Sequence, residues 1–145
     1  MTDSFPELRA AAVDERAHNI YYRQAQLERL IQAVLHNVPK LREAIATDYG
    51  HTTGETAIEI HLTLAALKRD YASVQPAKAH DDEYRIFAGK DAATNRKTFG
   101  IVYIEPCAHT LLYSILVPLS AAITAGNCVI VLVRLVTHAG SWLHD

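Results

Sequence analysis

The feature that most constrains this chain is a long apolar segment without formal charge. Between Pro106 and Val133 there is no Asp, Glu, Lys or Arg, although charged residues make up 21% of the 145 residues. After Glu105 only Arg134 and Asp145 carry a formal charge. Because so much apolar surface is unfavourable in water, we expect this segment to be buried, either in protein or in a membrane.

A membrane span and a protein core are both compatible with its length. Residues 111–133 exceed the roughly 20 apolar residues that a bilayer span needs. However, Pro118 lies inside the segment, and Gly126-Asn127 divides it into a helix-length piece and a strand-length piece. No cluster of Lys or Arg flanks it to anchor a helix at the membrane surface. We therefore expect a protein core and no membrane association.

The net charge, the number of cysteines and the first ten residues argue against nucleic-acid-binding, disulfide-rich and secreted proteins. A net charge of −2 without a basic cluster gives no electrostatic footprint for nucleic acid. Cys107 and Cys128 are too few for a disulfide framework. Residues 1–10 lack the basic and apolar regions of a signal peptide. These features predict a reduced, cytoplasmic protein of one domain, with a core of ordinary size.

Residues 1–75 are predicted to form a helical layer with one buried face. The first helix begins with Ser4 as N-cap, Pro6 in its first turn and Glu7 completing a capping box. A second helix begins near Tyr21. Its apolar residues recur every three or four positions, as expected for one helix face: Leu27, Ile31, Val34, Val38, Leu41 and Ile45.

Local signals also place the ends of these helices. Pro39 should interrupt the second helix, with Asn37 as the N-cap of a fresh segment. Gly50 is a typical C-terminal stop. A third helix is predicted from near Thr53 to Gln75-Pro76. The residues it should turn inward are Ile60, Leu64, Leu67 and Tyr71.

The second half of the chain predicts an α/β unit. Residues 76–97 read as a polar connector, with a short strand at Tyr84–Phe87. In residues 98–145, Phe99–Ile104 is a predicted buried strand, Thr110–Ala125 a buried helix and Cys128–Val133 a second strand. Strand, helix and strand form a βαβ unit, whose parallel sheet normally needs cover on both faces.

The residue types that carry chemistry do not assemble into a known motif. Cys107 and His109 follow a predicted strand end, but neighbours of this kind on a loop need not face each other. Glu55 and Glu59 are expected on a solvated helix face, and residues 81–83 in a solvated acidic loop. No glycine-rich loop could cradle a phosphate. No metal-ligand spacing occurs among the histidines considered: His18, His36, His51, His61, His80, His138 and His144.

Two stretches of the second half carry recognisable motifs: residues 99–106 (FGIVYIEP) and residues 117–130 (VPLSAAITAGNCVI). They resemble the first strand, the apolar helix and the A-G-N turn of the aldehyde dehydrogenase superfamily, in particular of its shorter class that handles fatty and aromatic aldehydes. Residues 22–27, 41–45 and 48–50 are similar to the amino-terminal helices of the same family. The resemblance implies a helical layer followed by the first βαβ unit of a Rossmann-like NAD(P)-binding domain.

The same resemblance implies oxidation of aldehydes to carboxylic acids with NAD or NADP, by a cysteine nucleophile and a glutamate base. Neither Cys107 nor Cys128 matches that nucleophile, and the family's later segments are not found in this chain. Ala108 stands where the family has the asparagine of its oxyanion hole. Leu132 and Leu135 stand where the family has the lysine and glutamate that bind the adenosine ribose.

We therefore assign no catalytic, cofactor-binding or metal-binding residue, and expect a truncated relative that is inactive alone and binds no cofactor well. The family positions that survive are Gly100, Pro106, Pro118, Gly126 and Asn127, whose roles there are structural. Two alternatives stay open. The chain could be an interaction module that docks on a full-length aldehyde dehydrogenase or on itself through an unpaired strand edge. It could also be a gene remnant without a biochemical role.

Overall fold

The chain combines several helices with a small parallel sheet, which places it coarsely in the α/β class. The computed structural model describes residues 6–14, 16–90 and 98–132. Its elements, in order, are α1 (Pro6–Val13), the short 3-10 helix η1 (Arg16–His18), α2 (Ile20–Tyr49), α3 (Thr53–Ser73), α4 (Pro76–Phe87), β1 (Ile101–Ile104), α5 (Leu111–Thr124) and β2 (Cys128–Val131). The predicted cap at Ser4 lies outside the described residues.

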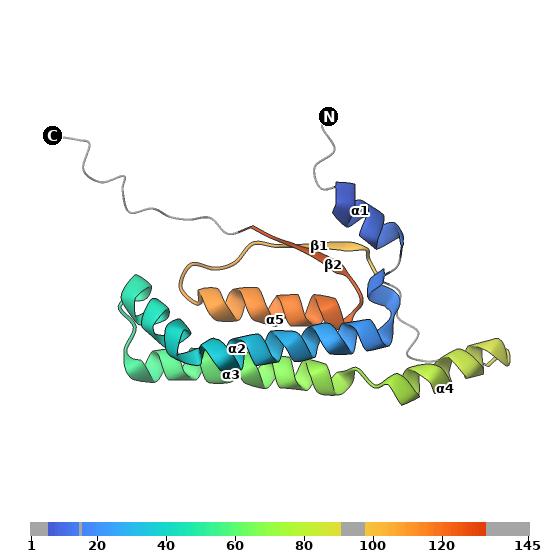
Figure 1. Ribbon diagram of the computed structural model, residues 1–145, viewed down its shortest axis with the longest axis horizontal. Helices are drawn as coiled ribbons and strands as arrows, with labels where there is room; N and C mark the ends of the chain where they lie inside the picture. Colours follow the sequence, from blue (N-terminus) through green and yellow to red (C-terminus); the bar gives the residue numbers. More distant parts are fainter. Residues whose placement is uncertain (1–5, 15, 91–97, 133–145) are drawn as a thin grey trace.

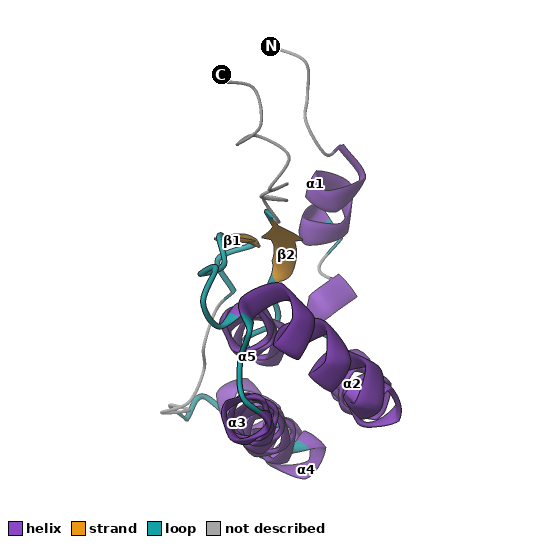
Figure 2. Cartoon of the chain, turned by 90° about the vertical axis from the view of Figure 1, so that its left-hand side faces the viewer, coloured by secondary structure: helices purple, strands orange, loops and turns teal. Residues whose placement is uncertain are grey.

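The elements stack in layers, with α5 in the middle. Helices α2 and α3 pack side by side, and α5 lies between this pair and the sheet of β1 and β2 (Figure 1). The end-on view shows the same order, with the sheet on the side of α5 away from α3 (Figure 2). Helix α1 contacts both strands, and α4 extends beyond the pair and contacts α2.

The predicted apolar stripe forms the core between α2 and α3. Leu27 and Leu67 are fully buried, and Ile31 and Val34 pack in the same region. Leu116 of α5 packs against this cluster, so the middle helix closes the core from above. Full burial of a leucine side chain contributes about 2–3 kcal/mol. This packing is what joins the helical half of the chain to the βαβ half.

The predicted break at Pro39 is wrong, because α2 runs without interruption from Ile20 to Tyr49. Pro39 is exposed, while Val34 and Ile45 on either side of it are buried. Asn37 does not cap a new helix, since its Nδ2 donates to the carbonyl of Ala33 at 2.8 Å. Burial of the stripe on both sides therefore outweighs the single hydrogen bond and the local strain that proline costs a helix.

The predicted strand at Tyr84–Phe87 is also wrong, as is the reading of residues 81–83 as a loop. Residues 76–87 form helix α4, with Pro76 in its first turn and Arg85 in its last. Proline in the first turn and a cation near the carboxyl end both favour a helix. A strand needs a neighbour, and among the described residues β1 and β2 pair only with each other.

The βαβ prediction is confirmed. Strands β1 and β2 are parallel, with Ile101 opposite Cys128 and Ile104 opposite Val131, and α5 crosses between them. The prediction that the strands are buried is wrong, because Ile104 alone among their residues is buried. Among the described elements, α5 packs on the sheet and α1 contacts both strands, yet Tyr103 of β1 stays 56% exposed.

The turn between α5 and β2 explains the A-G-N motif. Gly126 has φ +81°, and a Cβ there would lie 2.8 Å from Thr98 Cγ2. Asn127 is buried, and its Oδ1 accepts hydrogen bonds from the backbone N–H groups of Phe99 and Gly100 at 2.8 and 3.1 Å. One glycine and one amide side chain thereby align the start of β1 with β2.

The apolar segment is divided as its sequence predicts. Up to Leu132 it forms α5, the turn at Gly126-Asn127 and β2. Among the helices of the described ranges, none combines the length and hydropathy needed to cross a bilayer.

Candidate functional site

A pocket of about 460 Å³ lies between α3 and the amino-terminal end of α5. We call it the α3–α5 pocket. Its lining residues come from the start of α3, from the loop after β1 and from the first turn of α5. They are His51, Glu55, Ile58, Glu59, Leu62, Thr110 and Tyr113. The carboxyl end of a parallel strand is where α/β proteins commonly place their functional residues, and this pocket lies beside the loop that follows β1.

The start of α3 is fixed by a capping box. Thr52 is the N-cap: its Oγ1 accepts from the Glu55 N–H at 3.3 Å, and Glu55 Oε2 accepts from the Thr52 N–H at 2.8 Å. The Thr52 hydroxyl also donates to Glu55 Oε2 at 2.8 Å. The hydrogen bonds that the Glu55 carboxylate accepts, first from the Thr52 backbone and then from its hydroxyl, lower the pKa of Glu55 below its ordinary value. Glu55 is therefore a solvated carboxylate, as predicted, with a structural role at the helix start.

The prediction that Glu59 lies on a solvated face is wrong. Glu59 follows Glu55 by one helical turn but is only 7% exposed, because α5 packs over it. Its Oε1 accepts from the backbone N–H of Tyr113 at 3.2 Å, in the first turn of α5. The carboxylate thus sits at the positive end of the α5 dipole. Among the described residues, Glu59 Oε2 has no hydrogen-bond partner and no cation pairs with the side chain.

The other end of α5 is held by a cation. Arg23 of α2 donates from Nη1 to the carbonyl of Thr124 at 2.8 Å and from Nη2 to the carbonyl of His18 at 3.2 Å. Burial lowers the pKa of Arg23 from its ordinary value, although an arginine stays charged at neutral pH. Helix α5 is therefore capped by an acid at its start and a base at its end, both from the helical half.

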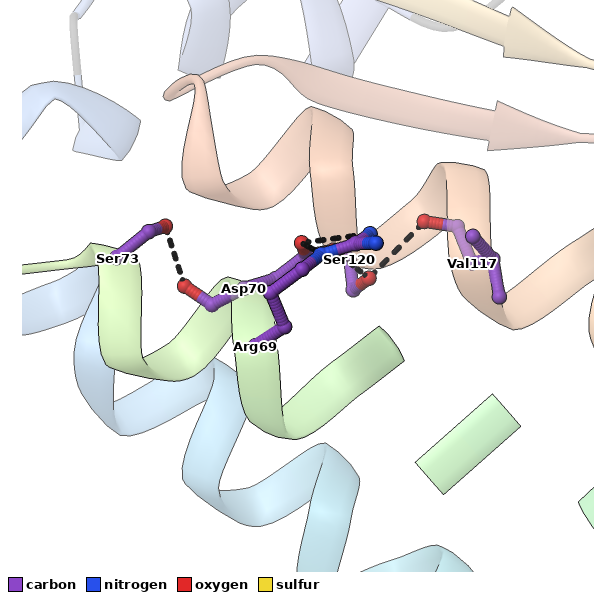
Figure 3. A network of polar contacts seen from close by, with 5 residues as sticks. All are labelled: Arg69, Asp70, Ser73, Val117 and Ser120. Carbon is purple, nitrogen blue, oxygen red and sulfur yellow. Dashed lines mark hydrogen bonds and ion pairs between the residues drawn. The ribbon is translucent and has the colours of Figure 1, made fainter. Parts of the chain in front are cut away.

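The middle of α5 carries a buried polar contact to α3. Ser120 Oγ donates to Asp70 Oδ2 at 2.5 Å, and both residues are buried (Figure 3). Arg69 Nη2 lies 3.2 Å from the other carboxylate oxygen, Oδ1, and Ser73 donates to the backbone carbonyl of Asp70. Because Ser120 is fully buried, no substrate could reach its hydroxyl. We read this network as a structural tie between two helices.

The loop after β1 does not assemble a nucleophile. Cys107 and His109 are both exposed, and no hydrogen bond joins them. The Cys107 N–H donates to Ser114 Oγ at 3.0 Å, which tethers the loop to α5. Ala108 is exposed beside them and offers no side-chain donor. The structure therefore does not bring Cys107 and His109 together.

The histidines are dispersed over the described elements. His18 Nε2 bonds to Thr98 Oγ1 at 2.7 Å, which links η1 to the start of the βαβ half. His80 Nδ1 lies 3.9 Å from Glu83 Oε2 on α4, and His51 lines the α3–α5 pocket. Within residues 6–14, 16–90 and 98–132, no three His, Cys, Asp or Glu side chains are grouped to hold a metal ion. His138 and His144 lie outside these ranges.

A carboxylate lies where the pyrophosphate of a nicotinamide dinucleotide would be expected in a βαβ unit. A pyrophosphate would be expected at the amino terminus of the helix that follows the first strand, where backbone N–H groups attract anions. Here the Glu59 carboxylate already occupies one of those N–H groups. Glu105 is also the one formal charge between Thr98 and Leu132, and it has the wrong sign for a phosphate. Leu132, which follows β2, is half-buried and apolar; Leu135 lies outside the described residues.

No family model, no curated protein and no solved structure matches this chain. The aldehyde dehydrogenase relationship therefore stays a prediction from the motifs. What the site itself provides is an acidic, partly apolar pocket and a middle helix whose two ends are capped by side chains of opposite charge.

Proposed function

We propose that this chain is an aldehyde dehydrogenase-like protein that has no aldehyde-oxidising activity of its own. In this proposal α1 to α4 correspond to the family's helical layer, and β1, α5 and β2 to the first βαβ unit of its Rossmann-like cofactor domain, in a cytoplasmic protein. The parallel βαβ unit and the structural use of Gly126 and Asn127 support the relationship.

One observation carries the lack of activity: the Glu59 carboxylate is bonded to the amino terminus of α5. An anion held there repels a second anion, so a dinucleotide pyrophosphate would have to displace a buried carboxylate. The proposal also requires that no thiol is activated for catalysis, and the exposed thiol after β1 is that of Cys107. It lies on an exposed loop without a base bonded to it, and the described residues provide no built environment to activate it.

The experiment is a direct assay of the purified chain with hexanal or benzaldehyde and either NAD or NADP. We expect no formation of reduced nicotinamide above the reaction without protein, and no shift of the thermal midpoint on adding either dinucleotide. An authentic aldehyde dehydrogenase in the same assay is the positive control. Reduced nicotinamide that depends on both the chain and the aldehyde would overturn the proposal, and Cys107→Ala and Cys128→Ala would then identify the thiol responsible.

A second candidate function is an interaction module, and the open sheet favours it. Among the described residues each strand is paired on one edge and unpaired on the other. Tyr103 is 56% exposed on β1. Unpaired edges and exposed aromatic residues are typical sites for strand addition from another chain. The occupant in this proposal is a full-length aldehyde dehydrogenase or a second copy of this chain.

Gel filtration at micromolar concentration tests this second candidate, with and without a full-length aldehyde dehydrogenase. We expect co-elution and an altered activity of the enzyme, or a dimer of the chain by itself. Tyr103→Lys should abolish the complex, since a charged edge residue opposes strand pairing. Leu35→Lys, which changes an exposed leucine of α2, is the matched control and should leave it intact. A monomer that elutes alone in both experiments would exclude the module.

A further inference from the structure

The α3–α5 pocket contains a buried negative charge that no basic side chain balances. Glu59 is 7% exposed, and its Oε1 has one backbone donor. Its Oε2 has no partner among the described residues and is not a fully buried atom, so it is accessible from the pocket. Neither Lys nor Arg lines the pocket. A carboxylate with so little exposure gains most from a partner of opposite charge, and the lining supplies none.

The other ionisable side chains of the lining form no hydrogen bond with Glu59. His51 packs its ring against Tyr49, and its Nδ1 is buried without a hydrogen bond, so a ligand in the pocket does not reach that atom. Glu55, at the rim, adds a second carboxylate that stays ionised because it caps α3.

The rest of the pocket is apolar. Ile58 and Leu62 of α3 are 60% and 50% exposed, and the ring of Tyr113 on α5 completes this apolar wall. Such exposure is unfavourable for aliphatic side chains and is reduced when a hydrocarbon ligand covers them. A volume of about 460 Å³ lies within the range of small-molecule pockets. The surface therefore combines a hydrocarbon-binding wall with an anionic end.

We infer that the α3–α5 pocket binds a small primary amine, whose ammonium group pairs with Glu59 and whose alkyl or benzyl part covers the apolar wall. An ammonium supplies three donors and the missing positive charge, while it leaves the bond from Tyr113 to Glu59 Oε1 intact. The same charge disfavours carboxylates and phosphates. This assignment is independent of the proposed function, which gives the chain no ligand.

The test is a matched ligand series on the unmodified chain, followed by amide NMR shifts or calorimetry. Hexylamine, hexan-1-ol and hexanoate share one hydrocarbon length and differ in the charge of the head group. We expect hexylamine to bind about tenfold or more tightly than hexan-1-ol, hexanoate to show no binding, and the shifts to concentrate at Glu59 and Tyr113. Equal affinities for the amine and the alcohol, or shifts confined to other elements, would overturn the inference.

Three variants locate the site. Glu59→Gln keeps an acceptor for the Tyr113 N–H but removes the charge, so the preference for amine over alcohol should disappear. Leu62→Ala shortens the apolar wall at an exposed position and should weaken the amine and the alcohol equally. Leu35→Ala removes a comparably exposed leucine from α2, outside the pocket, and should change neither affinity. Undiminished amine preference in Glu59→Gln would contradict the assignment even where the other variants behave as expected.

Discussion

Gly126 is the position at which a single methyl group should be most informative. Its φ of +81° lies in the left-handed region, where an L side chain costs about 1–2 kcal/mol. A Cβ would also lie 2.8 Å from Thr98 Cγ2 and 3.1 Å from the carbonyl oxygen of Ala17. Thr98 cannot simply rotate away, because its hydroxyl bonds to His18 at 2.7 Å. Overpacking of this kind adds about 1–3 kcal/mol.

Gly126→Ala should therefore lower the free energy of unfolding by about 2–5 kcal/mol in total. The matched control is Gly50→Ala, since Gly50 has a similar φ of +64° but nothing within 4 Å of the added Cβ. It should show the backbone cost alone, about 1–2 kcal/mol. Urea unfolding followed by circular dichroism measures both values. If the two variants lose the same stability, the close approach of the turn to Thr98 and Ala17 is refuted.

Three further changes test the polar contacts around α5 and α3. Arg23→Met keeps an unbranched aliphatic stem but removes the hydrogen bonds to the carbonyls of Thr124, at the end of α5, and His18, in η1, and urea unfolding should show a loss of about 1–3 kcal/mol. Ser120→Ala leaves Oδ2 of the buried Asp70 carboxylate without its donor and should also cost about 1–3 kcal/mol in the same assay. Thr52→Ala removes the hydrogen bonds of its hydroxyl to Glu55 and should raise the pKa of Glu55, which an NMR titration of the side-chain carboxyl carbon would measure. A lowered folded-state pKa contributes stability that is present above the unfolded pKa and is lost as pH falls through the folded pKa. The unmodified chain should therefore lose more stability than Thr52→Ala as the solution is acidified below the ordinary value of 4.5.

The arginine and serine changes each have a control variant. Arg29→Met changes an exposed arginine of α2, and Ser73→Ala removes an exposed hydroxyl that bonds only to a backbone carbonyl. Both should change stability by about 0.5 kcal/mol or less. Equal losses in Arg29→Met and Arg23→Met, or in Ser73→Ala and Ser120→Ala, would show that α5 is not held by these contacts. An unchanged carboxyl titration in Thr52→Ala would contradict the capping box.

Periodic and capping signals predicted the helices well where they are local. The stripe from Leu27 to Ile45, the stop at Gly50 and the start near Thr53 are confirmed because each depends on residues within one or two turns. Pro39 shows the limit of such signals. The local preference of proline is to break a helix, but burial on both sides of it keeps α2 continuous.

The contacts that make up the site were harder to predict, because their partners are distant in the chain. Glu59 meets Tyr113 across 54 positions, and Arg23 meets Thr124 across 101. In the sequence, Glu59 differs little from Glu55, yet one is buried and the other solvated. Helix phase does not separate them, because the two lie one turn apart on the same face. Glu55 is in the first turn of α3 and caps it, whereas Glu59 lies one turn further on, against the start of α5.

The amino-acid sequence by itself determined the three helices before residue 75, the division of the uncharged segment by Gly126-Asn127 and the parallel βαβ unit. These follow from backbone propensity, turn chemistry and hydrophobic period, which act over a few residues. Only the tertiary structure decided which charges are buried and where the apolar surface stays open. Packing of α5 onto α3 desolvates Glu59 and forms the pocket beside it, and the contacts of α5 and α1 with the sheet leave Tyr103 of β1 exposed. Both outcomes depend on contacts between distant segments, because desolvation is a property of the assembled layers.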